Sequence, residues 1–259
     1  MKIVPQRLAF IRPCVPSTAV RPSQGADWIH EPKWDGFRFQ IIKDGAGVRL
    51  YSKSGAEYTD RLPGMVAAFS SMPTESAILD GELVLIDPVG AAHFYRLMRE
   101  MRTRGPDETQ LKFLAFDLLY QDGVDLRGLP LGQRKRDLNR LCRKSKVPFL
   151  RLVETFPDGD VLLDWCNNFG FEGVVSKRLS SRYASGPSRN WVKVKCPDWK
   201  RDNAERFRTF QGQSKPPPSE RERALKKKRE ELSRVRERLQ ALRKHQAILE
   251  QEIAELEQA

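Results

Sequence analysis

The 259-residue sequence has only three histidines and four cysteines. The cysteines, at positions 14, 142, 166 and 196, form no CxxC pair, so we expect neither a zinc site nor a disulfide framework. No apolar run approaches the roughly 18 residues that span a bilayer. Residues 1–20 contain three prolines and scattered arginines instead of the apolar segment of a signal peptide. These absences predict a reduced, cytoplasmic protein without a membrane partner.

Two common nucleotide-binding signatures are also missing. The sequence contains neither GxGxxG nor GxxxxGK[ST], so a bound nucleotide would not use a standard phosphate loop. It does carry 46 basic against 34 acidic side chains, a formal net charge of +12. This excess favours a negatively charged partner, and a nucleic acid or a nucleotide is the leading interpretation.

The composition divides the chain into three parts. Residues 1–210 mix aromatic residues, glycine and proline with short apolar runs, which is typical of a globular domain. Residues 211–219 contain three successive prolines and predict a linker. Residues 220–259 contain no glycine, proline or aromatic residue and predict a long helix.

The predicted helix has a heptad pattern typical of coiled coils. Eight of ten seam positions are apolar, and the two rows are Leu225, Leu232, Leu239, Gln246 and Ile253, and Lys228, Val235, Leu242, Leu249 and Leu256. Self-association is favoured over docking on the globular domain and over a basic helix that is alone or contacts DNA. Residues 220–245 carry a net charge of +6 and residues 246–259 a net charge of −4, so the pattern predicts an antiparallel homodimer.

Short strands dominate the predicted globular part. Asp44-Gly45 indicates a hairpin between strands at 37–42 and 48–52. Further strands are expected at 78–86, 112–119, 172–177 and 191–195, and helices at 61–70, 93–103, 131–144 and 158–168. Because strands and helices do not alternate strictly, we expect an α+β fold with antiparallel sheets.

Five segments carry candidate chemistry, and each has a plain structural interpretation when taken alone. Lys33 lies before a turn and could be a solvated surface lysine, as most lysines are. Asp80 and Glu82 flank a glycine, which a hairpin or bulge explains as well as a metal site does. Residues 113–120 read as a core strand, and residues 171–178 as a strand with charged ends. Lys193 and Lys195 share one face of a strand, an unfavourable arrangement unless an anion lies between them.

Taken together and in order, the segments resemble the nucleotidyltransferase domain of ATP-dependent DNA ligases. The similarity is greatest to the ligase domain of bacterial non-homologous end-joining ligases and covers roughly residues 8–200. The KxDGxR box corresponds to residues 33–38, and the later boxes correspond to residues 80–82, 116–120, 172–177 and 193–195.

This resemblance implies a nucleotidyltransferase fold of the ATP-grasp-like type, in which helices flank antiparallel sheets. It also implies that Lys33 forms a covalent lysyl-AMP, passes the AMP to a DNA 5′-phosphate and allows the 3′-hydroxyl to be joined. A lysine nucleophile attacks as the neutral amine. The implied ATP-binding residues are Glu31, Lys33, Arg38, Lys53, Glu82, Phe116, Lys193 and Lys195, and the implied Mg²⁺ ligands are Glu82 and Glu172.

Two departures from the family pattern affect the expected activity. Lys53 replaces the arginine of a Ser-Arg-x-Gly box, which keeps the charge but loses the bidentate fork suited to phosphate. After Lys195, no series of alternating strands follows, so we expect the oligonucleotide-binding barrel of full ligases to be absent. Complete ligation is therefore less firmly predicted than the fold.

Three functions remain open from the sequence. The leading prediction is an ATP-dependent nucleotidyltransferase that acts on nicked or broken DNA in repair and recombination, in the bacterial cytoplasm and associated with the nucleoid. The alternatives are a non-catalytic protein that binds or bridges DNA ends through a degenerate ligase fold, and an RNA-joining enzyme.

Overall fold

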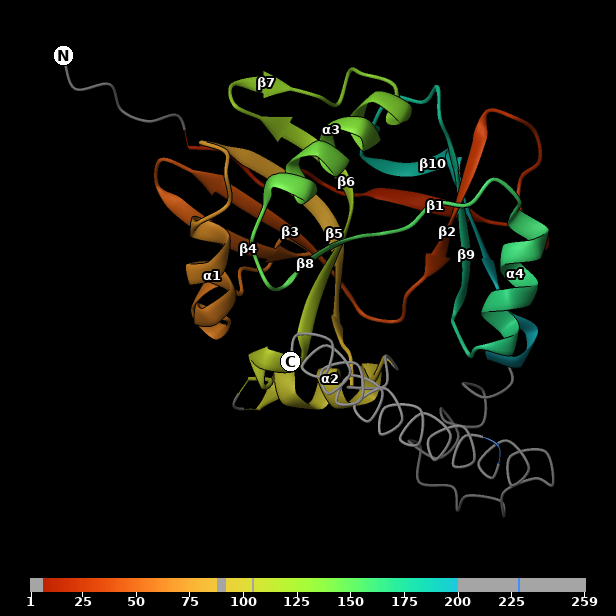
Figure 1. Cartoon of the computed structure of the whole chain (residues 1–259), viewed down its shortest axis with the longest axis horizontal. Coiled ribbons are helices and arrows are strands. Elements are labelled where there is room, and N and C mark those ends of the chain that lie inside the picture. Colours follow the sequence, from red (N-terminus) through yellow and green to blue (C-terminus); the bar gives the residue numbers. More distant parts are fainter. Residues whose placement is uncertain (1–6, 88–91, 104, 200–227, 229–259) are drawn as a thin grey trace, which may run out of the picture. The chain divides into compact units, whose positions relative to one another are not determined.

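The computed structural model describes residues 7–87, 92–103, 105–199 and Lys228. The chain divides after Ala204, and every element below precedes that point (Figure 1). The predicted linker at 211–219 and the predicted coiled-coil helix at 220–259 lie outside the described residues, apart from Lys228. We expected no oligonucleotide-binding barrel after Lys195, and the residues beyond 199 on which this expectation depends also lie outside the described ones, apart from Lys228.

The smaller of two sheets has four strands in the order β1-β10-β9-β2. These strands are β1 (Cys14–Thr18), β2 (Trp28–Lys33), β9 (Gly173–Arg178) and β10 (Gly186–Lys195). The β10–β9 and β9–β2 pairs are antiparallel, whereas β1 runs parallel to β10. Strands from the two ends of the domain therefore pair with each other.

The larger sheet has six strands, and its main order is β4-β3-β5-β6-β7. They are β3 (Phe37–Asp44), β4 (Gly47–Ser52), β5 (Ala77–Leu85), β6 (Leu111–Gln121), β7 (Val124–Asp125) and β8 (Leu150–Leu152). Strand β8 pairs with β6 in parallel, and the other pairs are antiparallel. The predicted hairpin at Asp44-Gly45 is confirmed as the β3–β4 turn.

Four α-helices of the described residues before Ala204 flank the sheets, as Figure 1 shows. They are α1 (Pro63–Ser70), α2 (Phe94–Arg102), α3 (Leu131–Lys144) and α4 (Gly159–Asn168), with single 3₁₀ turns at Thr59–Arg61 and Glu108–Gln110. The Asp158 side chain caps α4 by accepting hydrogen bonds from the amides of Asp160 and Val161. None of the helices in the described part of the chain is long and apolar enough to cross a membrane.

The two faces of the larger sheet are packed differently. One face carries the main core, in which α1, α2 and α3 contribute Met65, Phe69, Leu97 and Leu138, among others. The opposite face turns toward the smaller sheet, and helix α4 packs separately on β9 and β2. The site lies on this second face, where the two sheets meet.

The structure confirms the predicted α+β class and the predicted strands and helices, with ends shifted by a few residues. The exception in length is β10, which begins at Gly186 instead of residue 191. The expectation of purely antiparallel sheets is wrong at two edges, because β1 and β8 each pair in parallel with a strand distant in sequence. Long connections allow parallel pairing that no local turn signal reveals.

Candidate functional site

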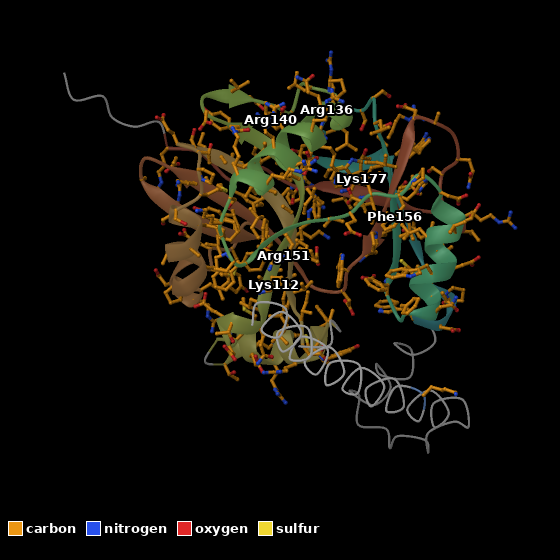
Figure 2. The ribbon with its side chains drawn as sticks, viewed as in Figure 1. Lys112, Arg136, Arg140, Arg151, Phe156 and Lys177 are labelled. Carbon is orange, nitrogen blue, oxygen red and sulfur yellow. The ribbon has the colours of Figure 1, made fainter. Side chains whose placement is uncertain are left out.

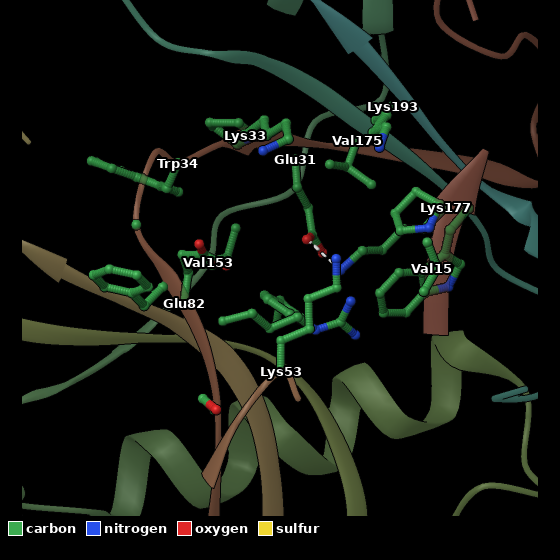
Figure 3. A pocket seen from close by; sticks show the side chains of 18 of the residues that line it. Val15, Glu31, Lys33, Trp34, Lys53, Glu82, Val153, Val175, Lys177 and Lys193 are labelled. Carbon is green, nitrogen blue, oxygen red and sulfur yellow. Dashed lines mark ion pairs between the residues drawn. The ribbon is translucent and has the colours of Figure 1, made fainter. Parts of the chain in front are cut away.

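A cavity of about 670 Å³ lies between the two sheets. Its walls come from β1, β2, β9 and β10 of the smaller sheet and from β3, β5 and β6 of the larger one, with Val153 after β8 and Phe94 of α2. Figure 3 shows the charged side chains entering it from both sheets. Seven of the predicted site residues line this cavity, namely Glu31, Lys33, Arg38, Lys53, Glu82, Phe116 and Lys193.

Lys33 and Lys195 lie on either side of one carboxylate. Lys33, the last residue of β2, donates a hydrogen bond from Nζ to Glu172 Oε2. The Nζ atom of Lys195 lies 3.1 Å from Glu172 Oε1. Glu172 is nearly buried, with its side chain 7% exposed, whereas Lys33 is 24% and Lys195 32% exposed. Glu172 and Lys195 are the two predicted residues that do not line the cavity. Glu172 contacts Lys33, which does line it, and Lys195 contacts Glu172.

Gly173 explains how this cluster can form. A Cβ atom on Gly173 would lie 1.9 Å from the carbonyl oxygen of Val194. Only glycine permits β9 and β10 to approach so closely at this point. The close approach brings Glu172, immediately before β9, between the lysines of β2 and β10.

Further positive charge surrounds the cluster. Burial lowers the pKa of Lys193, and the charges of Lys33, Lys195 and Lys53 lower it further. The four lysines thus lie close enough to repel one another, with Glu172 as the carboxylate contacted by two of them. Such a concentration of ammonium groups at a cavity suits a ligand with several phosphate charges.

Two carboxyl groups near Lys33 are held in a poorly hydrated environment. Burial raises the pKa of Glu82 to about 7, opposed by the charges of Lys33 and Arg38 and assisted by that of Glu172. Burial likewise raises the pKa of Asp35 to about 6, with the charge of Glu172 adding to it. Both groups therefore change their charge near neutral pH.

The geometry of Gly36 and Gly81 positions these carboxyl groups. A Cβ atom on Gly36 would lie 2.4 Å from the carbonyl oxygen of Leu83, so only glycine lets the turn after Lys33 press against β5. The β5–β6 register shifts between Asp80 and Gly81 and leaves Phe116 of β6 unpaired, an irregularity compatible with the bulge alternative. On the far side of the sheet, a Cβ atom on Gly81 would lie 2.5 Å from the ring of Phe113.

An aromatic wall closes one end of the cavity. The Phe116 ring lies edge to face with Trp191, with centroids 5.9 Å apart. Lys177 Nζ lies 4.2 Å from the Phe116 centroid and 4.1 Å from that of Trp191. The plain interpretation of residues 113–120 as a core strand holds for most of β6, but Phe116 itself is only partly buried and lines the cavity.

Glu31 is fixed by two lysines from distant segments. Lys135 of α3 donates to Glu31 Oε1, and Lys177 Nζ lies 2.6 Å from Oε2. Burial lowers the pKa of Lys177 to about 8, although the charge of Glu31 opposes this shift. Among the described residues, Lys177 Nζ finds no partner with hydrogen-bond geometry, despite being 2% exposed. The cavity thus presents a carboxylate acceptor beside an ammonium donor that has protons to share.

Arg38 is more constrained than its predicted role suggests. Its Nε and Nη2 atoms donate to the two oxygens of Asp80, at 3.0 and 2.7 Å, and Nη1 donates to the carbonyl oxygen of Cys14. The Tyr183 hydroxyl donates to Asp80 Oδ2 at 2.7 Å and helps to hold the Asp80 carboxylate in place. Arg38 therefore lines the cavity with most of its donors already occupied.

Three residues of this site were not predicted as functional. Lys177 is the last residue of the segment 172–177, which corresponds to one of the family's boxes. Its place in that box was the available signal. Trp191 begins the segment with the paired lysines. Lys135 could not have been found, because it lies 104 residues from Glu31 in a helix without a motif.

Replacing Glu82 by glutamine is expected to stabilise the fold at pH 8 but not at pH 5. The raised pKa means that the folded chain holds a proton here between pH 4.5 and 7 that the unfolded chain has lost. The stability contributed by this group therefore falls as the pH rises through that window, and glutamine removes the effect. Thermal unfolding of both proteins at the two pH values measures it. The exposed Glu154→Gln is the matched control, and an equal difference at both pH values would contradict the assignment.

The profile of a known family, described as the ATP dependent DNA ligase domain, matches residues 10–195. A multifunctional non-homologous end joining protein, LigD of Pseudomonas aeruginosa, is 35% identical over 189 residues, which are 72% of this chain and 22% of that protein. A probable DNA ligase of Rhodococcus opacus is 34% identical over 174 residues, 66% of this chain and 34% of that one. The chain thus spans about a fifth to a third of the length of these relatives.

Solved structures show the same fold. A mycobacterial DNA ligase D complexed with ATP and MES aligns with a TM-score of 0.62 and 34% identity, covering 71% of this chain and 59% of that one. The ligase domain of LigD from M. tuberculosis aligns with the same TM-score and 33% identity, covering 71% and 58%. The fold and the sequence therefore agree on one family.

Proposed function

The chain belongs to the family of ATP-dependent DNA ligase domains, and on this premise we propose that its cavity transfers AMP from ATP to Lys33 and then to a 5′-phosphate of DNA. The observation that carries the proposal is the position of Lys33, whose Nζ enters a nucleotide-sized cavity among three further lysines. Bacterial LigD proteins and probable DNA ligases as relatives support DNA as the substrate.

In the proposed first step, the Nζ lone pair of Lys33 attacks the α-phosphorus of ATP, and the bond from that phosphorus to the pyrophosphate oxygen breaks. Nζ loses a proton as the nitrogen–phosphorus bond forms, and Glu172 Oε2 is the acceptor already in contact with it. Lys193 and Lys195 lie where they can stabilise the charge that develops on the phosphate oxygens and on pyrophosphate.

The side chains present fit a magnesium ion that arrives with the nucleotide. Among the described residues, no group of three or more histidine, cysteine or carboxylate side chains is arranged to hold an ion alone. Magnesium usually binds through one or two carboxylates together with substrate phosphates, and Glu82 and Glu172 provide such oxygens. If bound there, the ion would neutralise part of the phosphate charge.

The aromatic wall and Glu31 account for a preference for adenine. We place the base on the Phe116 ring with its polar edge toward Glu31 and Lys177. Adenine offers an amino donor beside the N7 acceptor, whereas guanine offers two acceptors at the same edge. A carboxylate can only accept hydrogen bonds, so Glu31 would pair with adenine and repel guanine.

Glu31→Gln is therefore expected to reduce the preference for ATP over GTP by roughly 10- to 100-fold, since an amide can rotate to donate to guanine. The rates of covalent labelling of the chain with each α-labelled nucleotide measure this ratio. Glu154→Gln, an exposed substitution away from the cavity, should leave it unchanged. An unaltered ratio in Glu31→Gln would show that the base edge is read elsewhere.

The proposed function is tested by incubating the protein with Mg²⁺ and either α-labelled or γ-labelled ATP, then denaturing it. Only the α-label should remain attached to the chain, because pyrophosphate carries the γ-phosphate away. Chelation of the metal should prevent labelling. No α-label on a correctly folded protein would favour the alternative of a non-catalytic DNA-binding protein.

One further proposal concerns residues outside the described part of the chain, and another concerns the location of the protein. The antiparallel pairing of two helices at 220–259 would hold two catalytic domains at the ends of a rod, an arrangement suited to bridging DNA ends. A DNA substrate would also place the protein in the bacterial cytoplasm, and association with the nucleoid stays a prediction. Single cysteines at positions 222 and 258 test the helix orientation, since an antiparallel dimer crosslinks 222 to 258.

A further inference from the structure

Two basic side chains extend the floor of the cavity along the larger sheet. Lys112 is paired with Val84 on β5, and Arg151 is paired with Leu114 on β6. Because side chains alternate along a strand, Lys112 lies on the same sheet face as Leu114 and Phe116, and Arg151 on the same face as Val153. We call Lys112 and Arg151 the basic shelf.

A buried apolar cluster connects the basic shelf to the nucleotide cavity. Leu114, Val153 and Val84 form one buried apolar cluster, with Phe116 packed against it. Phe116 and Val153 also line the cavity. Figure 2 shows Lys112 and Arg151 near each other, well separated from Arg136 and Arg140 of α3. Helix α3 packs its Leu138 and Leu141 in the core on the opposite face of the sheet.

The two shelf charges repel each other, and although Lys112 Nζ lies 6.0 Å from the centroid of the Phe149 ring, no described carboxylate offsets them. Lys112 loses hydration on folding, which lowers its pKa, and the charge of Arg151 lowers it further. Neither side chain forms an ion pair with any residue in the described ranges. Arg151 Nη1 donates to the carbonyl oxygens of Pro148 and Leu150, at 3.2 and 2.7 Å. Like charges held together on a sheet cost stability unless an anion lies between them.

We propose that the basic shelf binds the sugar–phosphate backbone of the DNA substrate beside the site of joining. The proposal rests on the proposed function, because the shelf continues the cavity in which the AMP is transferred. Arginine suits bidentate contact with a phosphate, while lysine acts as a compact point charge. Contacts of this kind fix the position of the duplex without reading its sequence.

The strand geometry gives the distance of this contact from the nucleotide. Lys112 lies four residues before Phe116 on β6, which corresponds to about 13 Å along the strand. One DNA strand advances about 3.4 Å per nucleotide along the helix axis. A phosphate bound at Lys112 would thus lie about 13 Å from Phe116 along β6, a span of about four nucleotides of one strand.

The test measures binding of the full chain to a fluorescent nicked duplex with a 5′-phosphate, over salt concentrations from about 50 to 200 mM. Lys112→Ala with Arg151→Ala is expected to weaken binding roughly tenfold at the lowest salt and to reduce the log–log salt slope by about 2. Lys112→Arg with Arg151→Lys keeps both charges and should bind within about threefold of wild type. Thermal unfolding verifies that each variant is folded.

Arg136→Ala with Arg140→Ala is the matched control, since it removes two exposed charges from α3. It should bind DNA within about twofold of wild type. Equal losses of DNA affinity in both double variants would mean that only the net charge of the chain matters, which would overturn the proposal. Unchanged affinity in both variants would also overturn it. Shelf-dependent binding of polyglutamate without binding of DNA would also overturn it, in favour of an acidic protein partner.

Labelling of the wild-type protein by α-labelled ATP without DNA separates this proposal from the proposed function. If the protein is labelled but does not bind the nicked duplex, the proposed AMP transfer stands and the proposed role of the basic shelf is overturned. A protein that binds DNA through the shelf but is never labelled supports the shelf and overturns the chemistry.

Discussion

Lys33→Ala is expected to abolish covalent labelling by α-labelled ATP. The nitrogen–phosphorus bond needs an amine at the end of β2, where Lys33 Nζ touches Glu172. The cavity also contains Lys53, Lys177 and Lys193, but none of these lies in a KxDG sequence. Gel-based detection of label on the denatured chain measures the effect.

Two further substitutions separate chemistry from folding. Lys33→Arg keeps the positive charge beside Glu172 but cannot supply a neutral nitrogen, so it should fold normally and also fail to label. Lys146→Ala removes an exposed lysine away from the cavity and should retain full labelling. Label retained in Lys33→Ala would show that another residue is the nucleophile.

Arg134→Ala is expected to reduce the free energy of unfolding by about 3–5 kcal/mol, because it leaves the buried Asp117 charge without its partner. Arg134 and Asp117 are both 0% exposed and form a two-pronged pair at 2.8 and 2.9 Å. The remaining Nη1 atom donates to the carbonyl oxygens of Leu129 and Ser181. One side chain thus joins helix α3 to β6 and to the loop after β9.

The same helix provides the control for this prediction. Arg140 lies 3.4 Å from Asp137 but is 68% exposed, so Arg140→Ala should cost no more than about 0.5 kcal/mol. Urea unfolding followed by tryptophan fluorescence measures both variants, and all five tryptophans of the chain lie within residues 28–199. Equal losses in the two variants would mean that burial of the Arg134 pair is not what stabilises the fold.

Much of the fold could be predicted from the sequence, because its central strands obey local rules. The β3–β4 hairpin has a turn signal, and β5 and β6 are mostly apolar segments of the right length. Strands β1 and β2 escaped prediction because Pro16, His30 and Pro32 interrupt any alternating pattern. Strand β2 ends in Glu31, Pro32 and Lys33, so the demands of the site override strand propensity there.

The candidate site was predictable only where a motif carried it. The resemblance led to Lys33, Glu82, Phe116 and Lys193, which the structure brings together around one cavity. The clamp on Glu31 by Lys135 depends on how helix α3 packs on β6, and no local pattern encodes that contact. The basic shelf likewise arises from the parallel pairing of β8 with β6.

If Lys33 carries AMP as a covalent intermediate, mapping the adenylated residue will locate the AMP on this side chain. The wild-type chain is labelled with α-labelled ATP and Mg²⁺, denatured, digested and sequenced by mass spectrometry. We expect a single adenylyl group on Lys33, removed by adding pyrophosphate before denaturation. Adenylation of Lys177, Lys193 or any residue outside the cavity, with Lys33 unmodified, would contradict it.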